Sequence, residues 1–391
     1  MDADDGEQSH ESWKLIVFPL RLLPVLVFAI TGGLRPPDPL TRSLVGAPDA
    51  PLRSRGSLAA LTRGESEYFR GPQTSSSWTV QQSGVTARLR GVSVASADVA
   101  WASGSGGTVL RTEDRGVTWT RLTVPDSEKL DFRDIDAVNE RTAFVLSIGP
   151  GDASRIYKTS DAGATWTLQL RNSDPKAFFD AMAFRDDQSG FAFSDSVDDQ
   201  FVILRTTDGG ANWNRIPADA LPPALAGEGA YAASGTNVAL VGNHVWIGTT
   251  ASRVLHSVDG GKSWSVAQTP LPTSASAGIF SIAFRDASHG IVVGGDYRRE
   301  PEPGDGAITS DGGRTWTGVK GLSGFRSAVA YVPGAPHTVI AIGPSGGDIS
   351  TDGGKSWRVL PGPGFDTLSF APRLPIVWAA GQKGAIARGV H

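Results

Sequence analysis

Short apolar runs separated by polar, Gly-rich turns recur in groups of four along most of the chain. One group comprises FRDIDAV (132–138), TAFVLSIG (142–149), RIYKTSD (155–161) and TWTLQL (165–170). These runs have the length and the residue types of β-strands. Four strands within about 40 to 50 residues predict one blade of a β-propeller, with FRDIDAV as its innermost strand.

A motif of the form [S/T]-x-D-x-G-x-x-W recurs six times, and its tryptophans follow one another at intervals of 41 to 52 residues. The motif falls between the third and fourth strands of each predicted blade. There the carboxylate can accept backbone N–H groups of the turn, and the Trp ring can pack between strands. A turn is needed once per unit, whereas a catalytic residue is not, so we predict that these Asp boxes are structural. Their carboxylates are Asp114, Asp161, Asp208, Asp259, Asp311 and Asp352.

The two ends of the repeat region set the number of blades. After the sixth box the chain has three more strand-like runs, FDTLSF, IVWAAG and GAIARGV, and lacks a fourth. At the other end, WTVQQ (78–82) resembles the fourth strands that follow the boxes. We therefore predict an all-β, seven-bladed propeller of four-stranded antiparallel blades, closed by pairing residues 78–82 with residues 386–390. This closure leaves no open sheet edge.

Composition narrows the possible chemistry. The chain has 391 residues, 48 of them Gly, a net charge of −4 and no Cys. The absence of a basic excess argues against nucleic acid as a partner. The absence of Cys excludes disulfides, thiol catalysis and thiolate metal sites. No G-x-G-x-x-G follows a strand and there is no haem or flavin motif, so we predict no cofactor.

The first 77 residues differ from the repeat region. LIVFPLRLLPVLVFAI (15–30) has the length of a secretory signal core, although its leader is acidic and no clear cleavage site follows. We predict an export signal or membrane anchor in residues 1–30, a flexible Pro/Arg-rich linker in 31–77 and the propeller in 78–391. The protein is then exported, periplasmic or extracellular, with a possible N-terminal membrane association. The alternative is a misassigned start or a loosely packed tail.

The six boxes resemble those of Asp-box (BNR) propellers, a group that includes sialidases. The blade pattern, as in GFAFSDSVDDQFVILRTTDGGANW (190–213), is similar to the photosystem II stability/assembly factor type. Phrases such as GEGAYAASGT (227–236) further resemble exported bacterial propellers of unestablished activity. The resemblance implies the propeller fold, while function remains open because one fold hosts unrelated activities.

We expect a binding site on the face that holds the loops between second and third strands and those between successive blades. Three loops there are long: RNSDPKAFFD (171–180), PADALPPALAGEGA (217–230) and GGDYRREPEPGDG (294–306), and DSVDDQ (195–200) joins them. Aligning the inner strands gives one column near the channel mouth, which consists of Arg90, Arg133, Phe179, Glu228, Phe280, Arg326 and Asp366. Arg and carboxylate groups around one ring are also compatible with a solvated, mutually neutralising rim. The candidate ligand-binding residues are Asp180, Asp195, Glu228, Asp296, Tyr297 and Arg326.

Two classes of function fit these residues. The first is a monomeric binding or assembly scaffold whose partner is another protein or a glycan. The second is a carbohydrate-active hydrolase or lyase that uses carboxylates at the channel mouth. The only RIP triplet (215–217) follows the third box, a departure from the sialidase pattern that argues against that activity.

The oxygen-rich set Asp195, Asp198 and Asp199 could take Ca²⁺, but we predict no metal site. We interpret His256 and His289 as structural.

Overall fold

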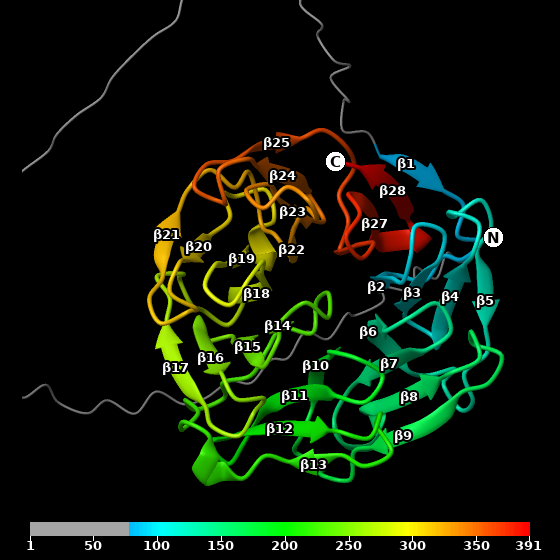
Figure 1. Ribbon diagram of the computed structural model, residues 1–391, viewed down its shortest axis with the longest axis horizontal. Coiled ribbons are helices and arrows are strands. Elements are labelled where there is room, and N and C mark those ends of the chain that lie inside the picture. The colour runs from blue at the N-terminus through cyan, green and yellow to red at the C-terminus, as the bar shows by residue number, and fades with distance from the viewer. Residues whose placement is uncertain (1–77) are drawn as a thin grey trace, which may run out of the picture. The chain divides into compact units, whose positions relative to one another are not determined.

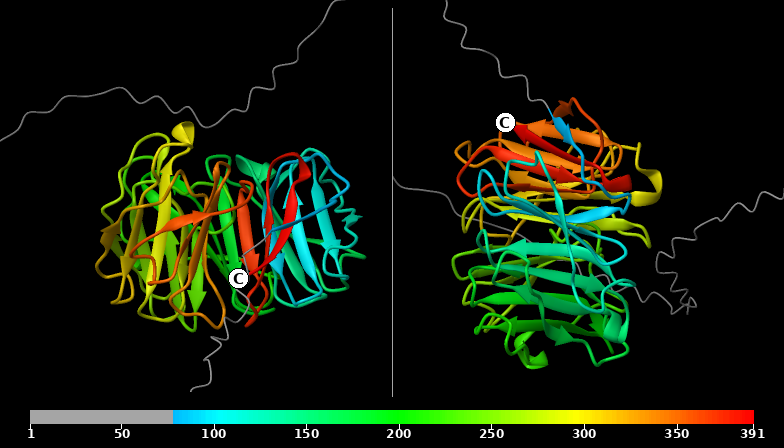
Figure 2. Two further views of the ribbon diagram at one scale, coloured as in Figure 1. Left: turned by 90° about the horizontal axis from the view of Figure 1, so that it is seen from above. Right: turned by 90° about the vertical axis from the view of Figure 1, so that its right-hand side faces the viewer.

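The computed structural model describes residues 78–391, and the predictions for residues 1–77 lie outside this range. The described residues form seven four-stranded antiparallel sheets arranged in a ring (Figure 1). This arrangement confirms the predicted fold class. Seen from the side, the strands run between two faces at which the connections gather (Figure 2). We call the face with the connections between second and third strands and between blades the upper face, and the opposite one the lower face.

Each blade runs from an innermost strand at the channel to an outermost strand at the periphery. The first three blades are β2 (Leu89–Val94), β3 (Ala100–Gly104), β4 (Thr108–Thr112), β5 (Thr120–Leu122); β6 (Asp131–Ala137), β7 (Ala143–Ile148), β8 (Arg155–Thr159), β9 (Thr167–Arg171); and β10 (Phe179–Phe184), β11 (Gly190–Val197), β12 (Gln200–Thr206), β13 (Asn214–Arg215). The next three are β14 (Val238–Val241), β15 (His244–Gly248), β16 (Arg253–Ser257), β17 (Ser265–Gln268); β18 (Ala277–Phe284), β19 (Gly290–Asp296), β20 (Gly306–Thr309), β21 (Thr317–Val319); and β22 (Ala328–Tyr331), β23 (Val339–Gly343), β24 (Gly346–Ser350), β25 (Arg358–Leu360). The seventh comprises β26 (Thr367–Phe370), β27 (Ile376–Ala380), β28 (Ile386–Val390) and β1 (Thr79–Gln81).

The ring is closed by the two ends of the described chain. β1 pairs antiparallel with β28, with Thr79 opposite Arg388 and Gln81 opposite Ile386. The Trp78 ring packs against Phe365, with ring centroids 5.4 Å apart. The predicted closure is therefore confirmed, because the first strand of the propeller supplies the outer strand of the last blade.

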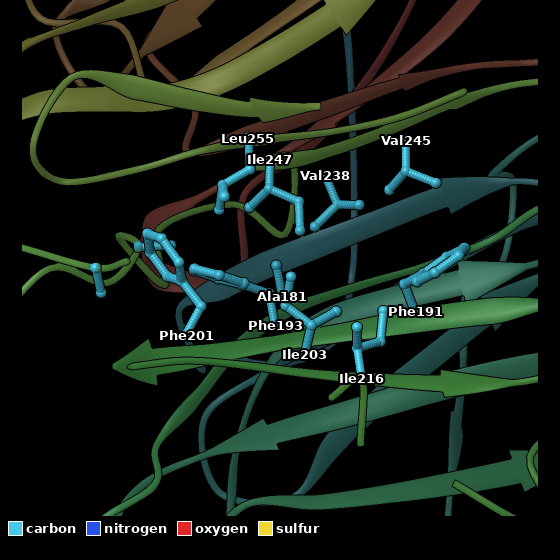
Figure 3. Close-up of a cluster of buried hydrophobic side chains, with 12 residues drawn as sticks. Ala181, Phe191, Phe193, Phe201, Ile203, Ile216, Val238, Val245, Ile247 and Leu255 are labelled. Carbon is cyan, nitrogen blue, oxygen red and sulfur yellow. The ribbon is translucent and has the colours of Figure 1, made fainter. Parts of the chain in front are cut away.

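The hydrophobic core consists of layers between neighbouring blades. Between the third and fourth blades, Phe191, Phe193 and Ile203 face Val245 and Ile247, and all five are almost completely buried (Figure 3). Successive residues point to opposite faces of a sheet, and both faces of the inner strands are covered by neighbouring blades, so that Ala143 to Ser147 of β7 are all buried. Each buried Phe, Ile or Val side chain contributes roughly 1.5–3 kcal/mol.

The Asp boxes fold in the same way in all six blades that carry one. In the third blade, Thr206 Oγ1 donates to Asp208 Oδ1 and accepts the Gly210 N–H, while both Asp208 oxygens bind Asn212. Hydrogen bonds of this kind, first of all from Thr118, lower the pKa of Asp114 to about 2. The boxes close the turns between third and fourth strands, at the lower face.

The inner strands of four blades carry a β-bulge at the upper end. The extra residue in each register is Arg90, Arg133, Asp180 or Phe280. The sequence alignment had placed Phe179 in this column, and it is one residue off because the bulge residue of the third blade is Asp180. The same alignment is wrong in the fourth blade, where the inner strand β14 begins ten residues after Glu228.

The segment DSVDDQ is also not a long loop. β11 and β12 continue to Val197 and Gln200, and only Asp198 and Asp199 form the turn. Both residues have positive φ, of 51° and 59°, as a type I′ hairpin turn requires. The third blade therefore has an extended β11–β12 hairpin here instead of a loop.

Candidate functional site at the upper face

The channel is occupied by the chain itself. Residues 230–237, which lead into β14, extend toward the centre of the ring (Figure 1). Ser234 Oγ donates to the carbonyl of Ser327 at 2.7 Å, and its own carbonyl accepts from Thr367 Oγ1 at 3.1 Å. On the other side, Arg133 Nη1 donates to the carbonyl of Ala232 at 3.1 Å. We call residues 230–237 the plug segment, because it joins the fourth blade to the second, sixth and seventh.

Glu228 lies just before the plug segment, and both of its carboxylate oxygens accept hydrogen bonds. Its side chain is completely buried and forms an ion pair with Arg253. Oε1 also accepts from Thr249 Oγ1 at 2.6 Å, and Oε2 accepts the Leu225 N–H at 2.9 Å. A carboxylate held by four donors fixes the connection between the third and fourth blades and is poorly placed to act as an acid, a base or a nucleophile.

Arg326 is the centre of a second buried ion pair. Its side chain is 1% exposed, and Nε donates to Asp348 Oδ2 at 2.7 Å. The remaining nitrogens donate to the Phe325 carbonyl and to Ser323 Oγ. These contacts hold the upper loops of the sixth blade together, and the Arg326 backbone N–H donates to the Gly294 carbonyl of the fifth blade at 3.1 Å.

Two further candidate carboxylates lie in the third blade. Asp180 is completely buried at the bulge of β10. Asp195 lies near the upper end of β11, and a Cβ atom on Gly229 would overlap its carboxylate. The next residue, Ser196, donates its N–H to the Glu228 carbonyl at 2.9 Å. The structure therefore brings Asp195 and Glu228 into adjacent segments.

Tyr297, which follows Asp296 in the chain, belongs to a cluster of aromatic rings that includes Tyr231 of the plug segment. Tyr231 stacks on Phe280 at 3.9 Å and 2°, and the Tyr297 ring meets both edge-on at 6.3 and 6.1 Å. Phe325 lies edge-on to Phe280 on the other side, at 4.6 Å. We call Tyr231, Phe280, Tyr297 and Phe325 the aromatic cluster. Neither Tyr231 nor Phe325 was among the candidate residues from the sequence, although Tyr231 lies in the phrase GEGAYAASGT (227–236).

The loop of the fifth blade supports this cluster. Tyr297–Arg299 form the short 3-10 helix η3, which projects from the upper face (yellow in Figure 2). Asp296 caps it by accepting the Arg298 N–H at 3.0 Å and also pairs with Arg299. Burial acts to raise the pKa of Asp296, but hydrogen bonds from Ser276, Arg298 and Arg299 outweigh it and lower the pKa. Burial also raises the pKa of Tyr231, and the neighbouring Tyr297 and Asp296 add to this effect.

Arginines gather at the channel mouth on the opposite side. Arg88 binds Asp366 through two hydrogen bonds of 2.8 and 2.9 Å, and Arg133 pairs with Asp131 at 2.7 Å. Burial, followed by the charges of Arg133 and Arg88, lowers the pKa of Arg90 to about 9. Arg and carboxylate groups therefore alternate in this sector, as the rim interpretation expected, but Arg90 and Asp366 are buried, so these groups are not solvated.

Glu300, in the long loop of the fifth blade, connects the two sectors. Its carbonyl accepts the Phe325 N–H at 2.9 Å and also Ser345 Oγ at 3.1 Å. Burial raises the pKa of its carboxyl group, with smaller opposing contributions from Arg88 and Arg90. The loop therefore extends over the sixth blade toward the arginines, a placement that no local sequence pattern revealed.

Neither a metal-binding cluster nor a membrane-spanning helix occurs within residues 78–391. There, no three His, Asp or Glu side chains are grouped closely enough to hold a metal ion. Asp198, one of the three residues considered for Ca²⁺, pairs with Lys176 at 2.8 Å. None of the helices in this range is long and apolar enough to cross a membrane.

No protein-family model and no curated protein matches the sequence. Solved structures do match the fold. One is YCF48 bound to a D1 peptide, with a TM-score of 0.58 and 18% identity over 80% of this chain and 95% of that one. YCF48 from Cyanidioschyzon merolae gives a TM-score of 0.56 and 19% identity over 80% and 98% of the two chains. These likenesses support the resemblance to assembly-factor propellers at the level of the fold.

A second group of similar structures consists of glycoside hydrolases. The GH74 xyloglucanase from Xanthomonas campestris has a TM-score of 0.56 and 17% identity, covering 80% of this chain and 53% of that one. The chain thus spans about half the length of that enzyme. At such identity the likeness shows a shared propeller fold and no more.

Proposed function

We propose that the chain is a binding module that holds a segment of a partner protein against its upper face. The aromatic cluster carries this proposal. Tyr231 and Tyr297 are half-buried, so each presents part of its ring at the surface while its base is fixed by Phe280. Tyr and Arg dominate the binding energy of protein interfaces because they combine large contact area with hydrogen-bonding ends. Here both types occur around one channel mouth.

The rigid support of the cluster favours binding further. The plug segment carries Tyr231, and it is tied to three other blades by side-chain hydrogen bonds. A preorganised surface loses little conformational entropy when a partner associates. YCF48 has been solved with a D1 peptide on the same fold, which supports a peptide as the class of ligand.

The hydrolase alternative is less favoured by the geometry. Glycosidases use two carboxyl groups separated by about 5–10 Å, one of them free to exchange a proton. Glu228 is held by Arg253, Thr249 and a backbone N–H, and Asp180 is completely buried. Stacked aromatic rings also suit sugars, so a glycan is the second candidate ligand.

Panning of a random peptide library on the immobilised protein tests the proposal. Peptides that bind the wild type should lose roughly tenfold or more in affinity for Tyr297→Ala, as expected for an interface aromatic residue. Val117→Ala is the matched control, because Val117 is 80% exposed in an Asp box on the lower face. Equal effects of both substitutions, or none, would place the binding site elsewhere. Binding of soluble oligosaccharides that Tyr297→Ala abolishes would assign the face to glycans instead.

We also propose that the protein is exported, on the basis of the apolar run at residues 15–30. A reporter fused after residue 77 should be recovered outside the cytoplasm, and deletion of residues 1–30 should retain it inside. Recovery of both forms in the cytoplasm would contradict export.

A further inference from the structure

The third blade has a cavity of about 340 Å³ at its upper, outer edge. One wall is the turn of the extended hairpin, with Asp198 and Asp199, and the floor includes Phe201. The other wall is the segment that leaves β13, with Leu221, Pro222 and Pro223. This segment begins with the 3-10 helix η2 (Ala218–Ala220), at the periphery of the ring (Figure 1). The aromatic cluster does not contribute to this cavity.

The cavity is a built feature of the fold. The two walls are joined by a hydrogen bond from the Ala224 N–H to the Asp199 carbonyl, at 3.3 Å. Arg253, held by Glu228, donates to the Pro223 carbonyl at 3.1 Å. The Phe201 ring is 1% exposed, and the Arg253 guanidinium lies 5.8 Å from its centroid. Fixed φ angles at the two prolines further limit movement of the wall.

The inner part of the cavity and its mouth differ in charge and polarity. Leu221 and Pro222 are half-buried and present apolar atoms, whereas Asp198 and Asp199 are exposed at the mouth. Asp198 is paired with Lys176 at 2.8 Å, and among residues 78–391 Asp199 has no ion-pair partner. The Arg253 charge below the floor is compensated by Glu228. The mouth therefore has an excess negative charge above an apolar slot.

We propose that this cavity binds a basic side chain, Lys or Arg, of a partner polypeptide. The aliphatic stem would contact Leu221 and Pro222, and the cationic end would meet Asp199, as long basic side chains bury their stems and keep their charge in water. An acidic side chain is repelled by the same aspartates. This inference rests on the proposed function only in assuming that the side chain belongs to a partner protein. The chemistry of the cavity can be tested with small molecules, without that protein.

The test uses n-butylguanidinium and n-butylammonium as probes, with n-butanol as the neutral analogue. Ligand-detected saturation-transfer NMR on the full-length protein measures the affinity. The cations should bind more tightly than n-butanol, and Asp199→Asn should weaken them about fivefold, the effect of losing one solvent-accessible charge pair. Asp187→Asn is the matched control, because Asp187 is exposed at the lower end of the same blade and should leave affinity unchanged.

A substitution that should raise the affinity for the cations, instead of lowering it, strengthens the test. Lys176→Met removes the partner of Asp198 and should tighten binding of both cations. Leu221→Ser should weaken the cations and n-butanol alike, because it alters the apolar wall and leaves the charge. Equal cation affinity in the wild type, Asp199→Asn and Lys176→Met would overturn the proposal, as would n-butanol binding as tightly as the cations. None of these outcomes depends on Tyr297→Ala, so failure here is distinct from failure of the aromatic cluster as the peptide site.

Discussion

Gly235 of the plug segment lies directly against the carboxylate of Asp134 on the inner strand of the second blade. A Cβ atom at position 235 would overlap that carboxylate, and Gly235 has φ +72°. Asp134 Oδ2 in turn accepts the Met182 N–H of the third blade at 2.7 Å. Burial raises the pKa of Asp134 well above its usual value. One close contact thus links the plug segment to two neighbouring blades at once.

Substitution of Gly235 by Ala should therefore destabilise the propeller. The matched control is Gly242→Ala, since Gly242 also has a positive φ, of 56°, but a Cβ there would meet no atom within 4 Å. Both variants carry the left-handed backbone strain of about 1–2 kcal/mol, and only Gly235→Ala adds the overlap with Asp134. Urea unfolding should give the larger loss for Gly235→Ala. Equal losses would show that the plug segment is free to move away.

Removal of one partner from the buried Arg326–Asp348 pair should cost about 3–5 kcal/mol, because the remaining charge is left buried and unpaired. Arg326→Met and Asp348→Asn are the single variants, and the double variant should lose less than their sum. Arg299→Met is the control, since Arg299 is 60% exposed in its ion pair with Asp296 and should change stability by less than about 1 kcal/mol. Additive single effects in denaturant unfolding would contradict this account.

The pH dependence of stability should reflect Asp136 in the second blade. Burial raises its pKa from 3.8 to about 6, although its carboxylate accepts the Phe184 N–H at 2.6 Å. The folded state therefore holds a proton that the unfolded state has lost, and this contribution to stability declines as pH rises from 3.8 to about 6. Asp136→Asn keeps the acceptor without the charge. Its stability relative to wild type should be greater at pH 7 than at pH 4, and a constant difference would exclude the titration.

The effect of His256 on the pH dependence of stability should be opposite to that of Asp136. Burial, followed by the charges of His244 and Arg314, lowers its pKa from 6.5 to about 4. Its ring nitrogen lies 3.0 Å from that of His244, and its ring stacks on Trp246. Because the unfolded state binds the proton first, stability is lost as pH falls from 6.5 toward 4. His256→Phe should reduce this loss in unfolding measurements at pH 7 and pH 4.5, whereas an unchanged pH profile would assign the loss to other groups.

The Asp boxes should affect folding and not binding. Asp208→Ala removes the acceptor of the Asn212 N–H and side chain, so the melting temperature should fall. Asp187→Ala, an exposed substitution on the same lower face, should leave the melting temperature nearly unchanged. Peptides selected on the upper face should bind the folded fraction of Asp208→Ala normally. Loss of binding at an unchanged melting temperature would make the box a functional site.

The sequence by itself determined the number of blades and the closure of the ring. Both depend on local signals, the Asp box with its following strand and the short apolar runs, and Trp78 with β1 matches the fourth-strand pattern without needing its partner. Local patterns failed where a residue was inserted or a connection lengthened. The bulge moved Asp180 into the position of Arg90 and Arg133, and the long connection displaced Glu228 from the inner strand.

Only the tertiary structure decided the composition of the upper face. Tyr231 reaches Tyr297 and Phe280 because the plug segment is held by Ser327 and Thr367, which are 93 and 133 residues away from Ser234. Contacts at such separation leave no periodic trace in a single sequence, since each depends on where the closed ring places the other blades. A hydrogen-bonded turn is encoded within eight residues, whereas a surface assembled from several blades exists only after the ring has closed.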